Sequence, residues 1–541
     1  MSGNPDPLRH PWGMRTVSIV VDQRASIPGA YLDTIPDSAI EELRSAFTYA
    51  NPEFEKARAM GFRKRIPRTI STAVYEGRTL TFPRGGLERV IGLLRSNDIE
   101  VEIEDKLSNG DQSIGKIPRH RVELYPFQDE MVEAAIRQGT CLLRAPQGSG
   151  KTTAALALAA RIGLPTLVIV STTNLLDQWI RRCTQELGLS EHEVGIIRGG
   201  KVRIGPITIA MQQSLRKHAL KLTRVFGTVI ADEVQLFAAS TFQNVVDRLA
   251  ARYRIGVSGD ERRADQKEFL IYDQFGSIAH EVKHEDMVAA GYVHEVEIRV
   301  VMTDFEADWF TKIHDPKKRV KALDKLLDEM LSNKERNELA LGCVKDQVSQ
   351  GEQVIVLSNR RDHCHALDAL ATSEKLSSGL FIGGPDYREQ FESTLRGIWA
   401  HEIDVAIGTY QAIGVGFDAP RVARGVCAMP VANSKKGEYQ FKQYRGRFAR
   451  TCKGKDDAIL YYLLDAHVFG LGALHNLIRW NNRVSVWDTG SNSWIEGKRF
   501  LDGKKTKRRS GKATDDEIVR IEEQPKRRRR SEASKPASAL R

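Results

Sequence analysis

Short apolar runs recur along the middle of the chain, each followed by a polar loop or a segment with helical periodicity. One set comprises residues 141–144, 166–170, 207–210 and 228–231, and a second set comprises 353–357, 404–408 and 459–463. Such runs, alternating with helices, are typical of strands buried in a parallel sheet with helices on both faces. The sequence therefore predicts an α/β protein with two similar parallel-sheet domains in tandem.

The flanking segments have other patterns. Strand-like residues 16–21 and helix-like residues 38–47 predict a smaller α+β domain at the N-terminus, and polar residues 108–118 predict a linker. Residues 304–337 are charged with a helical period, which predicts a surface helix or connector. The expected domain limits are 1–118 for an N-terminal accessory domain that recognises the substrate, 119–292 and 293–467 for the two α/β domains, and 468–541 for a C-terminal extension.

The 541-residue chain has a net charge of +11, most of it near the C-terminal end. Residues 498–541 contain 16 Lys and Arg and 7 Asp and Glu, a net +9, which leaves +2 for the rest. Because apolar residues are scarce beyond about 500, this basic tail is expected to be largely disordered. Its clusters at 504–509 and 526–530 favour an anchor for nucleic acid or a nuclear-import signal, and the alternative is a solubilising tail without a specific partner.

The sequence favours a protein of the cytoplasm, or of the nucleus in a eukaryotic host. No apolar run approaches the roughly 20 residues that span a bilayer, and the first residues lack the pattern of a signal peptide. The six cysteines have no zinc-site spacing, so free thiols in a reducing compartment are expected.

Residues 145–152, Ala-Pro-Gln-Gly-Ser-Gly-Lys-Thr, lie between the first apolar run and a helical pattern. Glycines in such a loop allow backbone N–H groups to surround phosphates, and the N-terminus of the following helix adds positive potential. Lys151 is expected at the outer phosphates and the Thr152 hydroxyl on Mg²⁺. The predicted nucleotide-binding residues of this motif are Gly148, Ser149, Gly150, Lys151, Thr152 and Thr153.

Two carboxylates, Asp232 and Glu233, directly follow the run 228–231. At the end of a buried strand such a pair suits metal binding through Asp232 and activation of the attacking water by Glu233. An isolated Asp-Glu pair is more often a solvated turn. Its position 81 residues after Lys151, in the same domain, favours the catalytic role.

A second motif, residues 443–450, lies about three hundred residues further along the chain. Arg447 and Arg450 are three positions apart, so on a helix they share a face. An arginine that approaches the γ-phosphate from another domain contributes about 10³–10⁵ in rate. The motif therefore predicts a site that the second domain closes, whereas alone it would indicate a solvated basic helix face.

Together these motifs resemble those of a superfamily 2 helicase or translocase, over roughly residues 120–467 and in the expected order. Residues 124–128 are similar to the adenine-reading element, with Gln128 as the base contact. Motifs Ia, Ib, IV and V correspond to residues 171–179, 212–215, 356–360, and 408–409 with 414–418. The sequence of motif V and the Leu175–Trp179 end of motif Ia are most similar to the XPB-like and UvsW-like branch. Asn51-Pro52 and Pro83-Arg84-Gly85 are similar to the N-terminal domain of its phage-type members.

The resemblance implies two RecA-like domains that bind ATP and Mg²⁺ between them. Gly416 and Asp418 join the nucleotide-binding residues by this comparison. Contacts with the backbone of DNA are expected from Thr172, Gln213, Ser214, Arg360 and Thr409, which suit sequence-independent binding.

Two motifs depart from the family pattern. Gln235 ends the acidic motif where many relatives have His, and we include it among the catalytic residues because an amide still hydrogen-bonds across the cleft. Ser258-Gly259-Asp260-Glu261 replaces the Thr-Ala-Thr-Pro of many relatives. The second change puts the coupling of hydrolysis to movement in doubt, but not hydrolysis itself.

The implied function is that of an ATP-dependent DNA helicase or double-stranded DNA translocase that remodels forks, branched DNA or recombination intermediates. One alternative is the motor subunit of a restriction or defence complex. Another is a catalytically inactive DNA-binding scaffold. RNA is not excluded, because none of these motifs reads the bases of the bound nucleic acid. The sequence indicates neither a membrane nor a particular protein partner, and a monomer is the expected state.

Overall fold

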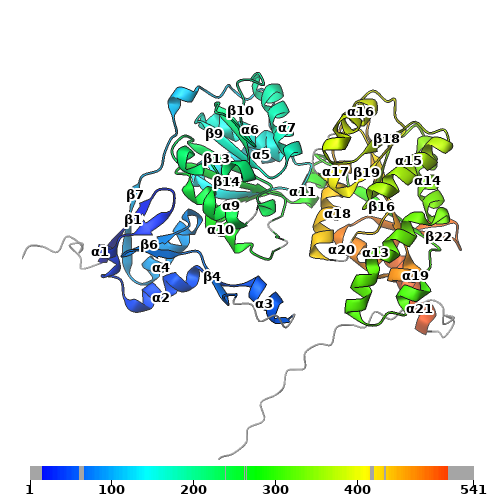
Figure 1. Ribbon diagram of the computed structural model, residues 1–541, viewed down its shortest axis with the longest axis horizontal. Coiled ribbons are helices and arrows are strands. Elements are labelled where there is room, and N and C mark those ends of the chain that lie inside the picture. The colour runs from blue at the N-terminus through cyan, green and yellow to red at the C-terminus, as the bar shows by residue number, and fades with distance from the viewer. Residues whose placement is uncertain are drawn as a thin grey trace, which may run out of the picture.

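Three large sheets follow one another along the described part of the chain in the computed structural model (Figure 1). The structure describes residues 15–59, 66–237, 239–260, 262–263, 265–414, 419–431 and 434–509. We refer to the parts built on the three sheets as the N-terminal unit, the first unit and the second unit. No helix within these ranges is long and apolar enough to cross a membrane.

The N-terminal unit is a five-stranded sheet in the order β5-β6-β2-β1-β7, with a projecting two-stranded arm of β3 and β4. Val17, Ile19 and Val21 alternate inward along β1, as a half-buried strand requires. Its elements are β1 Arg15–Val21, β2 Ala25–Ile27, α1 Gly29–Leu32, α2 Asp37–Ala46, β3 Thr48–Ala50, α3 Pro52–Ala59, β4 Thr69–Ser71, β5 Val74–Glu76, β6 Thr79–Phe82, α4 Leu87–Ser96 and β7 Ile99–Asp105.

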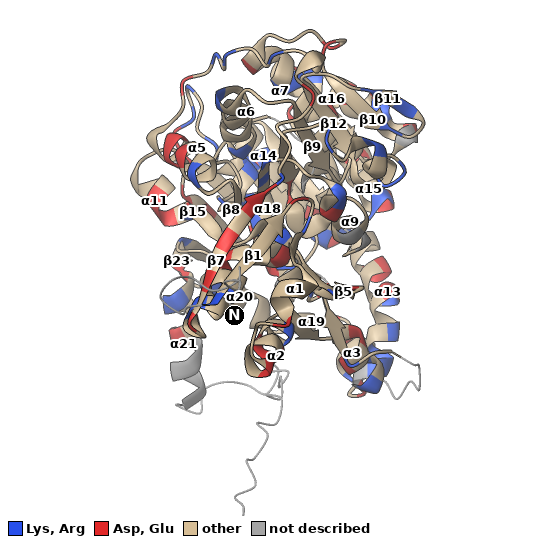
Figure 2. Cartoon of the chain, turned by 90° about the vertical axis from the view of Figure 1, so that its left-hand side faces the viewer, with Lys and Arg blue, Asp and Glu red and all other residues tan. Residues whose placement is uncertain are grey.

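The edge strand β7 is strongly acidic. Glu100, Glu102, Glu104 and Asp105 all lie on it, and Figure 2 shows them as a red strip along the strand. A phosphate backbone is repelled from such a strip. A nucleic-acid path over the N-terminal unit is therefore expected to avoid β7.

The first unit is an eight-stranded sheet in the order β11-β10-β12-β9-β13-β14-β8-β15, in which only the pair β10–β11 is antiparallel. One face packs against α5, α6 and α7, and the other against α9 and α10. Its elements are α5 Pro126–Gln138, β8 Thr140–Arg144, α6 Lys151–Ile162, β9 Thr166–Val170, α7 Thr173–Arg182, β10 Gly195–Arg198, β11 Lys201–Arg203, β12 Ile207–Met211, α8 Gln212–Leu215, β13 Thr228–Asp232, α9 Ala239–Asn244, β14 Tyr253–Ser258, α10 Phe269–Phe275, β15 Ile278–Glu281 and α11 His284–Ala289.

The second unit repeats this design in the order β18-β19-β17-β20-β21-β16-β22-β23, with only β22–β23 antiparallel. One face packs against α14 and α15, and the other against α13, α18 and α20. Its elements are β16 Val296–Met302, α12 Asp308–Thr311, α13 Pro316–Ser332, α14 Lys334–Val348, β17 Val354–Ser358, α15 Arg361–Ser373, β18 Ser378–Phe381, α16 Arg388–Trp399, β19 Val405–Thr409, α17 Tyr410–Gly414, β20 Arg424–Cys427, α18 Lys435–Phe448, β21 Ala458–Leu464, α19 Ala466–Phe469, α20 Gly472–Trp480, β22 Val484–Asp488, β23 Ser493–Glu496 and α21 Gly497–Arg509.

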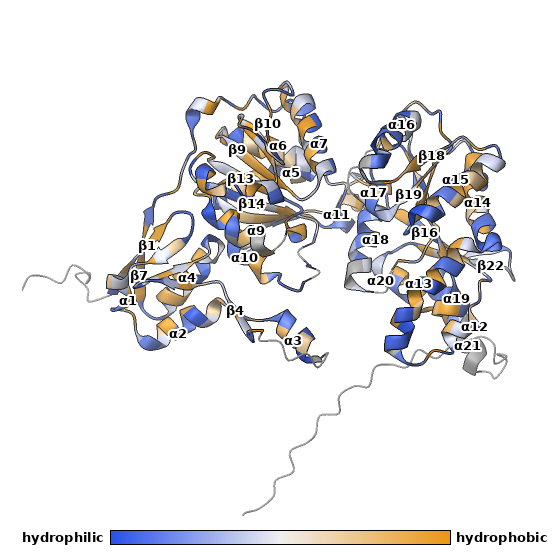
Figure 3. Ribbon diagram, in the orientation of Figure 1, coloured by the Kyte–Doolittle hydropathy of each residue, from blue (hydrophilic) through white to orange (hydrophobic). Residues whose placement is uncertain are grey.

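The predicted fold class is confirmed. Both large sheets are parallel through their centres, and Figure 3 shows their strands as hydrophobic segments enclosed by helices. The second sheet continues beyond residue 467, the expected end of that domain, because β22 pairs with β16 and buries Val484 and Val486. α21 likewise extends past residue 500 and buries Leu501, whereas the basic cluster 526–530 lies outside the described residues.

The N-terminal unit docks on α10 of the first unit. Asp273 is fully buried and accepts hydrogen bonds from Tyr49 Oη (2.7 Å), Arg89 Nη2 (3.0 Å) and the Thr72 hydroxyl. The backbone of Gly85 lies so close to α10 that a Cβ there would be 2.6 Å from the carbonyl oxygens of Tyr272 and Asp273.

We predict that Gly85→Ala weakens this docking by about 1–3 kcal/mol, because the obstructing atoms are backbone and cannot rotate away. Limited proteolysis and thermal unfolding measure the change. Gly92→Ala is the matched control, because a Cβ there has no neighbour within 4 Å and alanine favours the interior of α4. A Gly85→Ala protein as stable and protease-resistant as the Gly92→Ala protein would contradict this docking geometry.

Candidate nucleotide and nucleic-acid sites

The candidate catalytic groups of the first unit lie where neighbouring parallel strands end. Strands β9, β13, β14 and β8 are adjacent in the sheet, so the loops after them meet at one edge. This edge is where open α/β sheets bind ligands.

The phosphate loop joins β8 to α6. Gly148 and Gly150 have φ values of +86° and +74°, the left-handed conformation that favours glycine and turns successive N–H groups inward. The Ser149 hydroxyl is buried and has no hydrogen-bond partner among the described residues. An orphaned donor beside a helix N-terminus fits a phosphate group.

Two further side chains of this motif have protein partners. Lys151 Nζ donates to the carbonyl oxygens of Ala145 (3.1 Å) and Pro146 (3.3 Å) and lies 3.7 Å from Glu233 Oε1. Thr153 Oγ1 donates to Glu186 Oε1 at 3.2 Å. The lysine charge is thus held near Glu233, the candidate catalytic carboxylate, in a position that phosphates could take over.

Gln128 contacts the phosphate loop from α5. Its Nε2 donates to the Ser149 carbonyl at 2.9 Å, and its Oε1 accepts from the Tyr125 N–H at 3.0 Å. Tyr125, Phe127 and Tyr292 form an aromatic cluster beside it. Both ends of the amide therefore already have protein partners, and its role as the base contact stays a prediction.

Asp232 ends β13 and is buried. Trp179 Nε1 donates to Asp232 Oδ2 at 2.8 Å, which fixes the carboxylate. Burial, followed by the charge of Glu233, raises the pKa of Asp232 to about 6, although the Trp179 hydrogen bond opposes the change. A nearby cation strongly stabilises the ionised form of a carboxylate in such an environment.

Glu233 occupies a left-handed turn, with φ of +50°. Its carboxylate accepts hydrogen bonds from Gln147 Nε2 (2.8 Å) and Gln235 Nε2 (2.6 Å). Burial by itself would raise the pKa of Glu233, but the charge of Lys151 and these two hydrogen bonds outweigh it and lower that pKa. Glu233 is therefore ionised, as a general base must be.

The second unit supplies Arg447 and Arg450 to the same cavity. The cavity encloses about 380 Å³, and its wall includes Gln128, residues 147–153, Asp232, Glu233, Tyr292, Arg447 and Arg450. The sequence indicated that Arg447 and Arg450 share one helix face, and the structure corrects this. α18 ends at Phe448, and Arg450 follows in a bridge to Val293. The loop, rather than the helix period, aligns the two arginines.

The remaining nucleotide-binding predictions, Gly416 and Asp418, lie outside the described residues. Among the described residues no group of three or more His, Cys, Asp or Glu side chains could hold a metal ion by itself. Thr152 and Asp232, which share the cavity with the unpartnered Ser149 hydroxyl, nevertheless fit Mg²⁺ held jointly with phosphate.

A second cavity between the units encloses about 560 Å³ and is lined by polar side chains. Thr172 and Thr409, both predicted DNA contacts, line it from opposite units. Gln213, Ser214 and Arg360 do not line it. Arg360 Nη2 is 2.6 Å from Asp324 Oδ1, and Ser214 Oγ accepts from the Gly199 N–H at 2.8 Å.

Sequence reasoning missed three residues of these sites. Trp179 holds Asp232, Tyr439 reaches the catalytic turn from α18, and Arg361 lines the polar cavity. Trp179 lies within the segment similar to motif Ia, so only its partner was unknown. No pattern distinguishes Arg361 from the adjacent Arg360, or Tyr439 from the other aromatic residues of its helix.

The fold and the residues of the cavity are those expected of a P-loop ATPase, with two RecA-like units that line one candidate nucleotide cavity. A family model described as "Type III restriction enzyme, res subunit" matches residues 121–260. Probable helicase D10 of Escherichia phage T5 is 26% identical over 379 residues, which cover 69% of this chain and 78% of that protein. DNA 3'-5' translocase XPB2 of Sulfurisphaera tokodaii is 27% identical over 239 residues, covering 43% of this chain and 51% of that protein.

The crystal structure of T4 UvsW has a TM-score of 0.40 and 15% identity, covering 87% of this chain and 99% of that chain. The chain thus spans most of the phage T5 relative and about half of XPB2. The sequence matches confirm the resemblance drawn from the motifs. By these sequence matches the chain is similar to superfamily 2 helicases of the XPB-like kind, a class of ATP-dependent enzymes.

Proposed function

We propose that the protein is an ATP-driven double-stranded DNA translocase that remodels forks, branched DNA or recombination intermediates. One observation supports this most strongly. A single cavity combines the phosphate loop, Asp232 and Glu233 of the first unit with Arg447 and Arg450 of the second. Hydrolysis in such a cavity depends on how closely the two units approach.

The residues have separate roles in this proposal. Thr152 and Asp232 would hold Mg²⁺, which neutralises phosphate charge when bound. Glu233 takes a proton from the attacking water, and Lys151 shifts from its loop carbonyls to the outer phosphates. Arg447 and Arg450 stabilise the charge that develops on the transferred phosphoryl group, which corresponds to about 4–7 kcal/mol.

The polar cavity beside α18 supports a nucleic-acid path between the same units. The N-terminus of α7, which follows Thr172, and the guanidinium of Arg361 both suit phosphate contacts. Thr409 faces the cavity from the second unit, whereas Gln213, Ser214 and Arg360 remain proposed contacts outside it. The relative named as a DNA 3'-5' translocase supports DNA as the polymer.

We predict that Lys151→Ala abolishes nucleic-acid-stimulated ATP hydrolysis without unfolding the protein, because the lysine charge at the phosphates is lost. Turnover is measured with single strands, duplex, forks, four-way junctions and RNA. Lys201→Ala, on the exposed hairpin of β10 and β11, is the control and should match the wild type. Undiminished turnover in Lys151→Ala would exclude this site, and stimulation by RNA alone would exclude the DNA assignment.

We predict that Arg361→Ala weakens duplex binding for all sequences and reduces the slope of log K against log salt by about 1. Arg361 Nη2 donates to the Gly383 carbonyl (2.9 Å), and its guanidinium lies over the Tyr387 ring. Arg360→Ala removes the same charge one position earlier, from an ion pair with Asp324, and should change the slope less. Equal slopes for wild type and Arg361→Ala would remove the polar cavity from the DNA path.

A motor subunit of a restriction or defence complex is the second candidate, and the family model over residues 121–260 favours it. This candidate differs in partners rather than in chemistry. Co-purification of a nuclease or methyltransferase chain with the tagged protein would support it over a motor that acts alone.

A further inference from the structure

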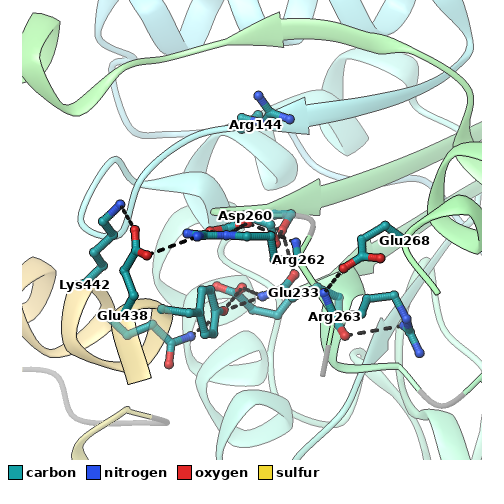
Figure 4. Close-up of polar contacts among 12 residues, drawn as sticks. Arg144, Glu233, Asp260, Arg262, Arg263, Glu268, Glu438 and Lys442 are labelled. Carbon is teal, nitrogen blue, oxygen red and sulfur yellow. Dashed lines mark hydrogen bonds and ion pairs between the residues drawn. The ribbon is translucent and has the colours of Figure 1, made fainter. Parts of the chain in front are cut away.

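Helix α18 contacts the first unit through an ion-pair bridge as well as through the nucleotide cavity. Arg262 Nη1 of the first unit lies 3.4 Å from Glu438 Oε2 on α18, and Lys442 Nζ lies 2.9 Å from Glu438 Oε1 (Figure 4). Asp260 holds the Arg262 guanidinium from the other side, with Nε to Oδ1 at 2.9 Å. This bridge is built from the altered segment that begins at Ser258.

Burial alone would raise the pKa of Glu438, but Lys442 and Arg262 outweigh it and lower that pKa. Glu438 is therefore ionised near neutral pH, and the bridge joins two full charges. The bridge links the N-terminal half of α18 to the first unit. The next residue on the helix, Tyr439, is placed by the same contact.

The Tyr439 hydroxyl has a complete set of hydrogen-bond partners. It accepts from Gln235 Nε2 of the first unit and from Gln443 Nε2 on its own helix, and its proton is directed to Glu233 Oε2 at 3.4 Å. A phenol offers two lone pairs and one proton, so no other arrangement of these three partners satisfies all of them. Burial and the neighbouring Glu233 raise the pKa of Tyr439, so the hydroxyl keeps the proton that it donates.

Gln235 is oriented by the first unit. Ser258 Oγ donates to Gln235 Oε1 at 2.6 Å, which turns the amide NH2 group toward Glu233 and Tyr439. The two departures from the family pattern, Gln235 and the segment that begins at Ser258, are therefore in direct contact. Ser258 orients Gln235, and Gln235 links the catalytic carboxylate to the second unit without a titratable group.

We propose that Tyr439 is a positioning residue for Glu233, contributed by the second unit, and that the Arg262–Glu438 bridge holds it in place. The inference rests on the proposed function and deepens it. The second unit then acts on both sides of the reaction, with arginines at the phosphates and a hydroxyl at the general base. At 3.4 Å the Tyr439 contact is long, and such contacts shorten when a site closes on substrate.

The test is Tyr439→Phe, which removes the hydroxyl and keeps the ring. We expect kcat for DNA-stimulated ATP hydrolysis to fall at least about tenfold while the KM for ATP changes less than about twofold, because only the orientation of the base is lost. Tyr461→Phe is the matched control. Its hydroxyl accepts from Arg299 within the second unit, away from the cleft, and kcat should be unchanged.

Arg262→Ala provides a second variant. This variant should also lower kcat. In the double variant Tyr439→Phe/Arg262→Ala the fold-decrease in kcat should be smaller than the product of the two single decreases, because both substitutions act through the position of Tyr439. A wild-type kcat in Tyr439→Phe, an increase in kcat, or a change confined to KM would each overturn the positioning role.

The proposed function fails separately. If the wild-type protein hydrolyses no ATP, or if Lys151→Ala remains active, then the motor assignment is wrong and the positioning role falls with it. If both behave as expected and Tyr439→Phe equals the wild type, only the role of Tyr439 is wrong.

Discussion

The site depends on charges that are buried before any ligand arrives. Lys151, Asp232 and Glu233 lie together in a cleft with little solvent contact. Buried charges are costly unless other groups pair with them or hydrogen-bond to them. Here Trp179 holds Asp232, and Gln147 and Gln235 hold Glu233. This arrangement fixes the catalytic groups in place, and phosphates would find donors already directed toward them.

Helix α18 lies beside both the nucleotide cavity and the polar cavity. Tyr439, Gln443 and Arg447 recur every four residues, so they lie along one side of the helix, toward the catalytic turn and the nucleotide cavity. Gln440 and Tyr444 lie on the adjacent side and line the polar cavity that we propose as part of the DNA path. A single helix therefore faces both candidate sites. A shift of α18 at the nucleotide moves the DNA-facing side by the same step, which provides a physical route for coupling.

The sequence predicted the parts of the structure that local patterns determine. The strands at 141–144, 166–170 and 228–231 reappear as β8, β9 and β13, because short apolar runs bounded by polar loops are typical of strands buried in a sheet. The phosphate loop was predicted from its glycines, and two of them have positive φ in the structure.

Contacts between segments that are distant in the chain could not be predicted from the sequence. Nothing in the 443–450 motif shows that α18 ends at Phe448, and the ion pair that directs Arg360 toward Asp324 joins residues 36 positions apart. β22 and β23 are short and separated from the earlier strands, so their place in the second sheet depends on the pairing of β22 with β16 and of β23 with β22. Tyr439 is significant only because folding brings it to Glu233.

The most direct test of the shared cavity is the steady-state kinetics of Arg447→Ala with saturating DNA, combined with nucleotide binding measured by a fluorescent ATP analogue. A transition-state role from the second unit predicts that kcat falls by about 10³ while nucleotide affinity changes only a few-fold. A kcat within a few-fold of the wild type would show that the first unit hydrolyses ATP without the second, which contradicts a site divided between them.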